Sequence, residues 1–503
     1  MVGSVDSCVL VGLEARPIHV EADISRGGDV KFFLVGLAAT TVKEARERVR
    51  SAIKNSGLEY PRTRFTVNLA PAELRKEGSG LDLPIAVAIA LAQARRPPPP
   101  QSAFLGELAL DGAVRHVDGV LVAARGLRDF GYKRVFVPAE DASEAALVDG
   151  LEVIPCESLS AVVMHLLGTE QIAAAAQNLS ALPEHIAAEH DLAEVHGQEE
   201  AKRALEVAAG GGHHLLLSGP PGAGKTMLAR CLPSILPPLE LQEALEVAQL
   251  RSLLGELPHD RPLDWTRPFR APHHSVSTAG LIGGGSRLAL PGEISRAHHG
   301  VLFLDELAEF QTAVLQALRQ PLESGRVSIT RSGGSVAYPA LFSLVAATNP
   351  CPCGWGGDDL RTCRCTPGAI DTYQRRLSGP LLDRIDLQVS VCRVPIEALA
   401  SEPRGEPSSL VRERVIHARR RQIERQGALN SQLKPGRLRQ LAPLAPGSRR
   451  TLERWSAQRG LTARGFHRAW RVARTAADLD GSDEVLEHHI LEALGFRLQD
   501  VAA

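Results

Sequence analysis

The sequence predicts a multidomain α/β protein, and three observations support this prediction. The chain has 503 residues, which is too long for one hydrophobic core and suggests roughly two to four domains. Its apolar fraction of 44% and charged fraction of 23% are typical of globular proteins and exclude an intrinsically disordered chain. Short apolar runs alternate with helix-like stretches up to residue 394, and the remaining C-terminal residues are helix-like and rich in arginine.

We expect the first domain, residues 1–170, to have an α+β fold. Strand-like runs at 31–35 and 64–69 alternate with a helix-like stretch at 42–55. Residues 171–190 are rich in Ala, Gln and His and have no apolar stripe. We therefore interpret them as the linker to the next domain.

The strongest chemical signal is a glycine-rich motif between a strand-like run at 214–218 and a helix-like run at 227–232. The motif consists of Gly219, Pro220, Pro221, Gly222, Ala223, Gly224, Lys225 and Thr226. In such a P-loop, backbone N–H groups turn toward phosphates, the lysine reaches the β and γ phosphates, and the threonine hydroxyl binds Mg²⁺. We predict a nucleotide and Mg²⁺ site here, the alternative being a chance glycine-rich turn.

An acidic pair comes directly after a second strand-like run. The four apolar residues 301–304 precede Asp305 and Glu306, as expected of a buried parallel strand that carries carboxylates to its C-terminal edge. We predict that Asp305 holds Mg²⁺ through water, and that Glu306 orients or deprotonates the water that attacks the γ phosphate. The alternative is an Asp-Glu pair that caps a helix.

A third apolar run, 341–347, ends in Thr348, Asn349 and Pro350, and so places a polar amide where a sensor of the γ phosphate belongs. The P-loop, the acidic strand and the terminal Asn occur in the order that resembles an AAA+ ATPase. Three more motifs narrow the resemblance: Arg-Pro-Phe-Arg-Ala-Pro-His-His at 267–274, Pro-Gly-Glu-Ile at 291–294 and Ser-Gly-Pro-Leu-Leu-Asp-Arg-Ile-Asp at 378–386. On these motifs the whole chain resembles the YifB/ComM family of magnesium-chelatase-like ATPases, whose best-known member is the competence helicase ComM.

The resemblance implies roles for residues outside the two nucleotide motifs. Asn349 matches sensor 1, Arg384 matches the arginine finger that reaches a neighbour's ATP site, and Arg464 matches the sensor 2 arginine of a C-terminal lid. Val195 and Gln198 belong to a segment similar to the one that packs against adenine in this class. An arginine finger requires an oligomer, and we expect this oligomer to be a homohexamer; the resemblance also implies ATP and Mg²⁺ as cofactors. Without the resemblance, either arginine is interpreted as a surface residue.

The domain organisation is also implied by the resemblance. Residues 191–395 correspond to an AAA+ core built on a parallel sheet, and residues 396–503 correspond to a basic helical lid. Through the segments 75–84, 106–108 and 118–121, residues 1–170 resemble the proteolytic domain of Lon proteases. However, Leu81 and Leu121 stand where the nucleophile and its lysine partner belong. We therefore expect a Lon-protease-like domain without the catalytic dyad.

Four of the eight cysteines lie in one loop, residues 351–365, directly after the predicted sensor. Their thiolates suit a structural zinc ion, although Cys-x₂-Cys is the commoner spacing; free thiols and redox chemistry are the alternatives. These cysteines form two Cys-x-Cys pairs: Cys351 with Cys353, and Cys363 with Cys365. The remaining cysteines are isolated and expected in hydrophobic cores: Cys8, Cys156, Cys231 and Cys392.

The net charge of −1 conceals a basic block near the C-terminus. Residues 410–475 hold 17 Arg or Lys and three acidic residues, a composition that suits a phosphate-rich partner; the alternative is a solvated helix face. Residues 324–338, with Arg326 and Arg331, are a second candidate contact. We expect them to form either a pore-facing hairpin or an ordinary surface hairpin.

The resemblance and the basic block together favour a ring-forming ATPase that acts on single-stranded or branched DNA. The expected function is that of a branch-migration helicase in recombination during natural transformation. A magnesium-chelatase-like protein-remodelling ATPase for metal insertion is one alternative, and an ATP-dependent protease is disfavoured because the dyad is missing. No apolar run reaches the about 20 residues of a transmembrane helix and no secretion signal is recognisable, so we expect a cytoplasmic protein without membrane contact.

Overall fold

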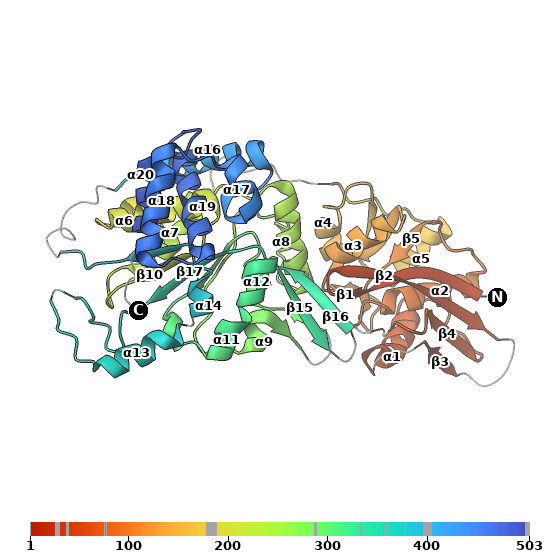
Figure 1. Ribbon diagram of the computed structural model, residues 1–503. Helices are drawn as coiled ribbons and strands as arrows, with labels where there is room; N and C mark the ends of the chain where they lie inside the picture. The colour runs from red at the N-terminus through yellow and green to blue at the C-terminus, as the bar shows by residue number, and fades with distance from the viewer. Residues whose placement is uncertain are drawn as a thin grey trace. The chain divides into compact units, whose positions relative to one another are not determined.

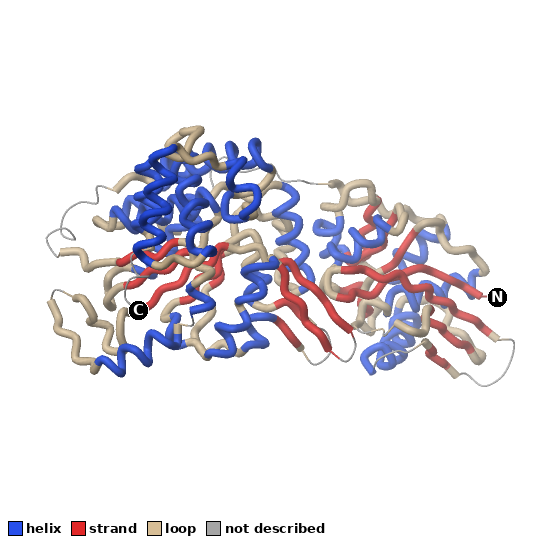
Figure 2. The backbone as a smooth tube through the Cα atoms, viewed as in Figure 1, coloured by secondary structure: helices blue, strands red, loops and turns tan. Residues whose placement is uncertain are grey.

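The structure is a computed structural model that describes residues 2–25, 31–36, 40–74, 76, 78–177, 189–285, 289–331, 334–358, 360–377, 379–395 and 405–497. The chain divides into two compact units (Figures 1 and 2). Unit 1 comprises Met1–Leu182 and Leu241–Asp264, and unit 2 comprises Pro183–Glu240 and Trp265–Ala503. Most of the expected linker, residues 178–188, lies outside the described residues. Its earlier part stays on unit 1, because the Ala175 N–H donates to the Val153 carbonyl at 2.8 Å.

Unit 1 is built on a seven-stranded mixed sheet with the order β3-β4-β2-β1-β5-β8-β9. The strands of this sheet are β1 (Val2–Val11), β2 (Glu14–Ile24), β3 (Phe32–Val35), β4 (Phe65–Ala70), β5 (Ser102–Phe104), β8 (Arg134–Pro138) and β9 (Glu152–Cys156), and β6 (Glu107–Leu108) pairs with β7 (Val114–Arg115). Its helices are α1 (Thr40–Asn55), α2 (Asp82–Ala94), α3 (Val120–Asp129), α4 (Ala142–Ala145), α5 (Leu159–Leu167) and α8 (Leu241–Leu253). The two predicted strands and the predicted helix of this region are confirmed.

The alternating pattern of the sequence explains how the sheet of unit 1 buries one face. In β4, Phe65, Val67 and Leu69 are buried, whereas the residues between them are partly exposed. Helix α2 is apolar on nearly all sides and is accordingly buried along its length. Leu81 and Leu121, at the positions expected for a Lon-type dyad, are both buried aliphatic side chains. The α+β fold class is therefore confirmed, and the Lon likeness stays a prediction.

Helix α8 belongs to unit 1 although its sequence lies between two parts of unit 2. The Ser252 carbonyl accepts from the Gly119 N–H at 2.9 Å, and the Ser252 hydroxyl accepts from the Leu121 N–H at 3.3 Å. These bonds cap the start of α3 with the end of α8. Residues 241–264 fall within the range predicted for the AAA+ core, whereas the structure groups them with the N-terminal unit.

The sheet of unit 2 is five-stranded and entirely parallel, with the order β11-β14-β17-β10-β18. Its strands are β10 (Leu215–Ser218), β11 (Phe269–Arg270), β14 (Val301–Leu304), β17 (Ser343–Thr348) and β18 (Leu387–Ser390), and two short ribbons are formed by β12 (Gly283–Gly284) with β13 (Leu290–Pro291) and by β15 (Arg326–Arg331) with β16 (Gly334–Pro339). The helices before residue 395 are α6 (Glu199–Gly211), α7 (Lys225–Ile235), α9 (Thr278–Ile282), α10 (Glu293–Arg296), α11 (Thr312–Ala317), α12 (Arg319–Ser324), α13 (Pro367–Arg376) and α14 (Gly379–Leu382).

The register of this sheet brings the predicted motifs to one edge. Ser218, the last residue of β10, is opposite Thr348, the last residue of β17, and Leu304 at the end of β14 is opposite Ala346. The segments after these strands carry the P-loop, the sensor amide and the acidic pair, respectively. Because parallel strands end together, the three motifs converge on a single crevice edge.

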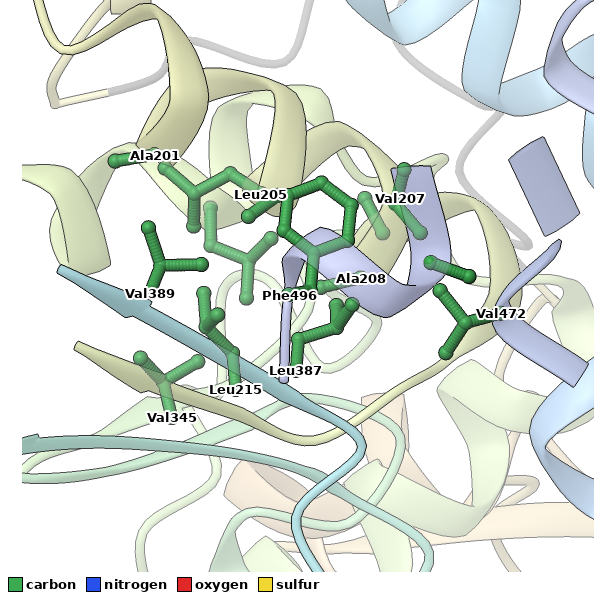
Figure 3. Packing of buried hydrophobic residues seen from close by; sticks show 14 of the residues in the cluster. Ala201, Leu205, Val207, Ala208, Leu215, Val345, Leu387, Val389, Val472 and Phe496 are labelled. Atoms are coloured by element: carbon green, nitrogen blue, oxygen red, sulfur yellow. The ribbon is translucent and has the colours of Figure 1, made fainter. Parts of the chain in front are cut away.

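The C-terminal region is helical, as predicted, and shares its core with the sheet. It contains α16 (Ser408–Gln426), α17 (Pro435–Leu441), α18 (Pro446–Arg459), α19 (Ala463–Leu479) and α20 (Glu487–Gly495). Figure 3 shows Phe496 and Val472 of this region beside Leu387 of β18 and Leu205 of α6, all in one hydrophobic cluster. The C-terminal helices therefore form one packed body with the five-stranded sheet.

A buried polar network also joins the lid to β10 and β18. The His213 ring lies 3.3 Å from the Asp386 carboxylate through Nδ1 and 2.8 Å from the Thr475 hydroxyl through Nε2. Burial alone would raise the pKa of Asp386, but the hydrogen bond with His213 and the charge of Arg468 hold it below its ordinary value. Asp386 therefore carries a charge that both α19 and the start of β10 help to satisfy.

Burial tests the expectation that the isolated cysteines lie in hydrophobic cores. Cys8, Cys156 and Cys231 are buried as expected, whereas Cys392 is exposed, so its placement in a core was wrong. Cys392 lies just past the end of β18, where the chain leaves the sheet. In the part of the chain that the structure describes, no helix is both long and apolar enough to cross a bilayer.

Candidate nucleotide site

The P-loop connects β10 to α7 through backbone conformations that favour glycine. Gly222 and Gly224 have φ values of 76° and 91°, in the left-handed region. A Cβ atom on Gly219 would lie 2.1 Å from the Val391 carbonyl oxygen, so this residue permits the close approach of two strands. The loop leads directly into the N-terminus of α7, whose free N–H groups and helix dipole favour bound phosphate.

Lys225 is held at the mouth of this loop. Its Nζ donates to the Gly219 carbonyl at 2.6 Å, the Pro220 carbonyl at 2.9 Å and the Asn349 Oδ1 at 3.1 Å. Burial lowers the pKa of Lys225, and the nearby carboxylates of Asp305 and Glu306 oppose that shift. The contact with Asn349 joins the predicted P-loop lysine to the predicted sensor amide.

Thr226 and Asp305 are brought into direct contact. The Thr226 hydroxyl donates to Asp305 Oδ2 at 2.8 Å, across the gap between α7 and the end of β14. A hydroxyl and a carboxylate form the all-oxygen ligand set that Mg²⁺ prefers. The residues present therefore fit the predicted metal.

Glu306 is oriented by a left-handed backbone conformation. Its φ is 52°, and its N–H donates to Asp305 Oδ1 at 2.9 Å. The side chain is 56% exposed, and its Oε2 lies 3.5 Å from Nδ1 of His274. His274 belongs to one of the sequence motifs but had no predicted role; its proximity makes it a neighbour that can hold the Glu306 carboxylate.

The two predicted arginines meet one carboxylate that no sequence motif marks. Nη2 of Arg384 donates to Glu323 Oε1 at 2.5 Å, and Nη2 of Arg464 lies 4.0 Å from the same oxygen. Glu323 lies on the short helix α12. The structure thus brings Arg384 and Arg464 together at Glu323.

The segment predicted to contact adenine lies against the P-loop. Val195 is buried, and Gln198 adopts a left-handed φ of 60° at the start of α6. The Gln198 Nε2 donates to the Ala223 carbonyl at 3.3 Å and to the Cys392 carbonyl at 2.5 Å. The side chain therefore links this segment to the P-loop and to the end of β18.

The four clustered cysteines form a compact set of sulfur atoms. All four Sγ atoms lie within 4.8 Å of one another, and three of the separations are 3.4–3.6 Å. Sulfurs about 2.3 Å from a tetrahedral zinc are about 3.8 Å apart, so the donor set fits that metal. Backbone hydrogen bonds from Trp355 and Arg364 lower the pKa of Cys353 to about 6, whereas burial raises the pKa of Cys351 in the same cluster.

This cysteine loop touches the nucleotide site. A Cβ atom on Gly354 would come within 2.7 Å of the Pro221 ring, and Gly354 has a left-handed φ of 81°. Cys351 lies two residues after the sensor Asn349. The conformation of the loop therefore bears on both the P-loop and the sensor.

Residues 324–338 do form a hairpin, as expected. Strand β15 pairs antiparallel with β16 in the register Arg326↔Pro339 to Arg331↔Gly334. Residues 332–333 and the Arg331 side chain lie outside the described part of the chain. The pore-facing position of this hairpin stays a prediction.

Comparison with known families covers most of the chain. Residues 191–399 match the family described as magnesium chelatase, subunit ChlI. Residues 20–141 match the family subunit ChlI of Mg-chelatase, and residues 405–497 match magnesium chelatase, subunit ChlI C-terminal. The matches thus include residues 20–141 of unit 1, the five-stranded sheet and the C-terminal helices.

Some individual relatives match over nearly their full length, and others over a part of it. The chain is 44% identical to the protein YifB of Escherichia coli over 495 residues, which is 97% of this chain and 96% of that protein. It is 43% identical to the competence protein ComM of Haemophilus influenzae over the same shares. The magnesium-chelatase 38 kDa subunit of Rhodobacter capsulatus is 29% identical over 174 residues, 31% of this chain and 48% of that subunit.

Glu306→Gln is expected to bind ATP and hydrolyse it about tenfold more slowly or worse, because the predicted metal ligand Asp305 remains while the carboxylate predicted to position water is lost. ATP binding and steady-state phosphate release measure the two effects. The matched control is Glu309→Gln, an exposed acid three residues further along the chain, which is expected to hydrolyse ATP normally. Near-normal turnover by Glu306→Gln would remove Glu306 from the mechanism.

Proposed function

The chain belongs to the YifB/ComM family of magnesium-chelatase-like AAA+ ATPases, and from that premise we propose that it is a ring-forming motor that hydrolyses ATP to move DNA. The family implies ATPase activity with ATP and Mg²⁺. The observation that carries the proposal is the convergence of Lys225, Asn349, Thr226 and Asp305 at one edge of a parallel sheet. This arrangement supports phosphoryl transfer to water.

Each side chain has a distinct task in the proposed hydrolysis. Lys225 binds the β and γ phosphates, and Asn349, already in contact with its Nζ, senses the γ phosphate. Thr226 and Asp305 hold Mg²⁺, which when bound offsets the negative charge of the phosphates. Glu306 accepts the proton of the attacking water, and Val195 and Gln198 border the adenine.

The site is completed by a neighbouring subunit in this proposal. Arg384 acts as an arginine finger toward the neighbour's γ phosphate, and Arg464 acts as sensor 2. Because Glu323 pairs with Arg384 in the single chain, the phosphates of a neighbour's ATP compete with this carboxylate for the guanidinium. A closed ring, for which we propose six subunits, gives every ATP site such a neighbour.

The proposed substrate is DNA. The relative ComM is a competence protein by name, and the basic block of residues 410–475 supports a phosphate-rich partner. We place the activity in the cytoplasm, as branch migration on single-stranded or branched DNA in recombination during natural transformation. The magnesium-chelatase relatives favour a second candidate, ATP-driven protein remodelling for metal insertion. An ATP-dependent protease is disfavoured, because buried leucines, Leu81 and Leu121, stand at the positions of the Lon-type dyad.

The direct test is strand displacement. Wild-type protein with ATP is expected to displace a strand from forked and three-stranded DNA, and Lys225→Ala is expected to displace none because it cannot hold the phosphates. Gel separation of the released labelled strand measures the activity. ATP hydrolysis by the wild type without displacement or DNA binding would favour the protein-remodelling function instead.

We also propose that the cysteine loop binds one structural zinc ion through Cys351, Cys353, Cys363 and Cys365. The sulfur separations and the four-thiol donor set support a closed tetrahedral site. Bound zinc would fix the loop that packs on Pro221 and lies just after the sensor strand. Its contribution is therefore to the shape of the nucleotide site rather than to the reaction.

Purified protein is expected to contain about one zinc per chain, because the four thiols form one donor set and binding of the metal stabilises the folded loop. Cys351→Ser with Cys353→Ser should lose the metal, whereas Cys392→Ser, an exposed cysteine outside the loop, should keep it. Elemental analysis under reducing conditions measures the content. A wild-type value below about a tenth of an equivalent would exclude the zinc site.

A further inference from the structure

The basic block of residues 410–475 divides into two parts according to its contacts. Most arginines of α16 and α19 are engaged within the protein, by carboxylates or backbone carbonyls. These are Arg412 with Ser234, Arg414 with Glu206 and Glu406, Arg419 with Ala209, Arg420 with Glu424, Arg421 with Asp483, Arg425 and Arg474 with Asp478, and Arg468 with Asp386. Their charges hold the lid together and are largely neutralised in place.

The second part, residues 434–454, keeps its charge; we call it the basic segment. It covers α17, α18 up to residue 454 and the residues between these helices, and its only acid is Glu453. Its six basic side chains are exposed, and none has a carboxylate within 4.0 Å in the described part of the chain: Lys434, Arg437, Arg439, Arg449, Arg450 and Arg454. The segment therefore presents uncompensated positive charge to solvent.

The basic segment is firmly anchored. Leu438 of α17 and Leu452 of α18 are fully buried in the core of unit 2, and the Ser448 hydroxyl donates to the Val485 carbonyl at 2.7 Å. Arg450 and Arg454 are four residues apart and so share one face of α18, opposite the buried Leu452. Fixed helices of this kind hold the charges in place before any partner binds, which reduces the entropy lost on binding.

The side chains around these charges indicate which kind of polyanion the basic segment suits. None of the exposed large hydrophobic side chains of the described chain lies in 434–454, so the segment lacks the apolar face with which a basic helix enters a membrane. It also lacks an open aromatic platform for unpaired bases, because Trp455 is only partly exposed and Arg459 covers its ring at 5.4 Å. Charge without stacking groups suits the phosphates of a duplex.

We propose that the basic segment binds the phosphate backbone of double-stranded DNA, independently of base sequence. This inference rests on the proposed function, which it deepens by assigning the duplex arm of the branched substrate to α17 and α18. Each arginine or lysine that neutralises a phosphate releases condensed counterions, so the affinity falls with salt in proportion to the number of contacts. Those arginines of α16 and α19 that are engaged within the protein contribute little to this dependence.

The test compares two doubly substituted full-length chains that lose the same charge. Arg450→Ala with Arg454→Ala removes two unpaired charges, and Arg420→Ala with Arg421→Ala removes two paired ones. Fluorescence anisotropy of a labelled duplex is measured across salt concentrations. The first variant is expected to bind at least about fivefold more weakly at about 0.1 M salt, with a slope of log affinity against log salt shallower by about 1.8. The control should keep the wild-type slope, and both should keep the ATPase rate measured without DNA.

The outcomes separate this inference from the proposed function. Wild-type protein that binds no DNA at low salt overturns the proposed function itself. Wild-type protein that binds duplex DNA while the Arg450→Ala, Arg454→Ala variant keeps its slope overturns only the assignment to the basic segment. A loss confined to single-stranded DNA, to RNA or to an acidic polypeptide, with duplex binding intact, likewise overturns the assignment.

Discussion

The parallel register of β10, β17 and β14 is the constraint on which the nucleotide site depends. Because these strands end together, the P-loop lysine, the sensor amide and the acidic pair meet without any long-range adjustment of the chain. The contacts of Lys225 with Asn349 and of Thr226 with Asp305 result from that register. Positioning of this kind is the main requirement of phosphoryl transfer, since the transition state needs aligned charges rather than covalent help.

The C-terminal helices pack on the same sheet and fix the surroundings of Arg384. They share a core with the sheet, and Asp386 links α19 to the residues that begin β10 and β18. Arg384 lies two residues before Asp386, so the proposed arginine finger is attached to a rigid junction rather than to a free loop.

The sequence predicted those parts of the site that are encoded by short contiguous motifs. The P-loop, the acidic strand and the sensor strand lie as expected, since apolar periodicity and glycine spacing are local signals. Glu323, His274 and the membership of α8 in unit 1 were missed because each depends on tertiary contacts that leave no local pattern. Cys392 was misplaced because burial of an isolated cysteine is decided by its neighbours in space. The sequence likewise did not show which arginines of the basic block form ion pairs within the protein, because those pairs also depend on tertiary contacts.

The proposed role of Arg384 is to complete the ATP site of a neighbouring subunit. Mixing Arg384→Ala protein with Lys225→Ala protein tests it most directly, because each variant alone lacks one half of every site. In a one-to-one mixture about a quarter of the interfaces combine an intact P-loop with an intact arginine, so ATP hydrolysis should reappear where neither protein alone has any. Hydrolysis by the mixture no greater than that of the separate variants would contradict this role and indicate that Arg384 acts within its own subunit.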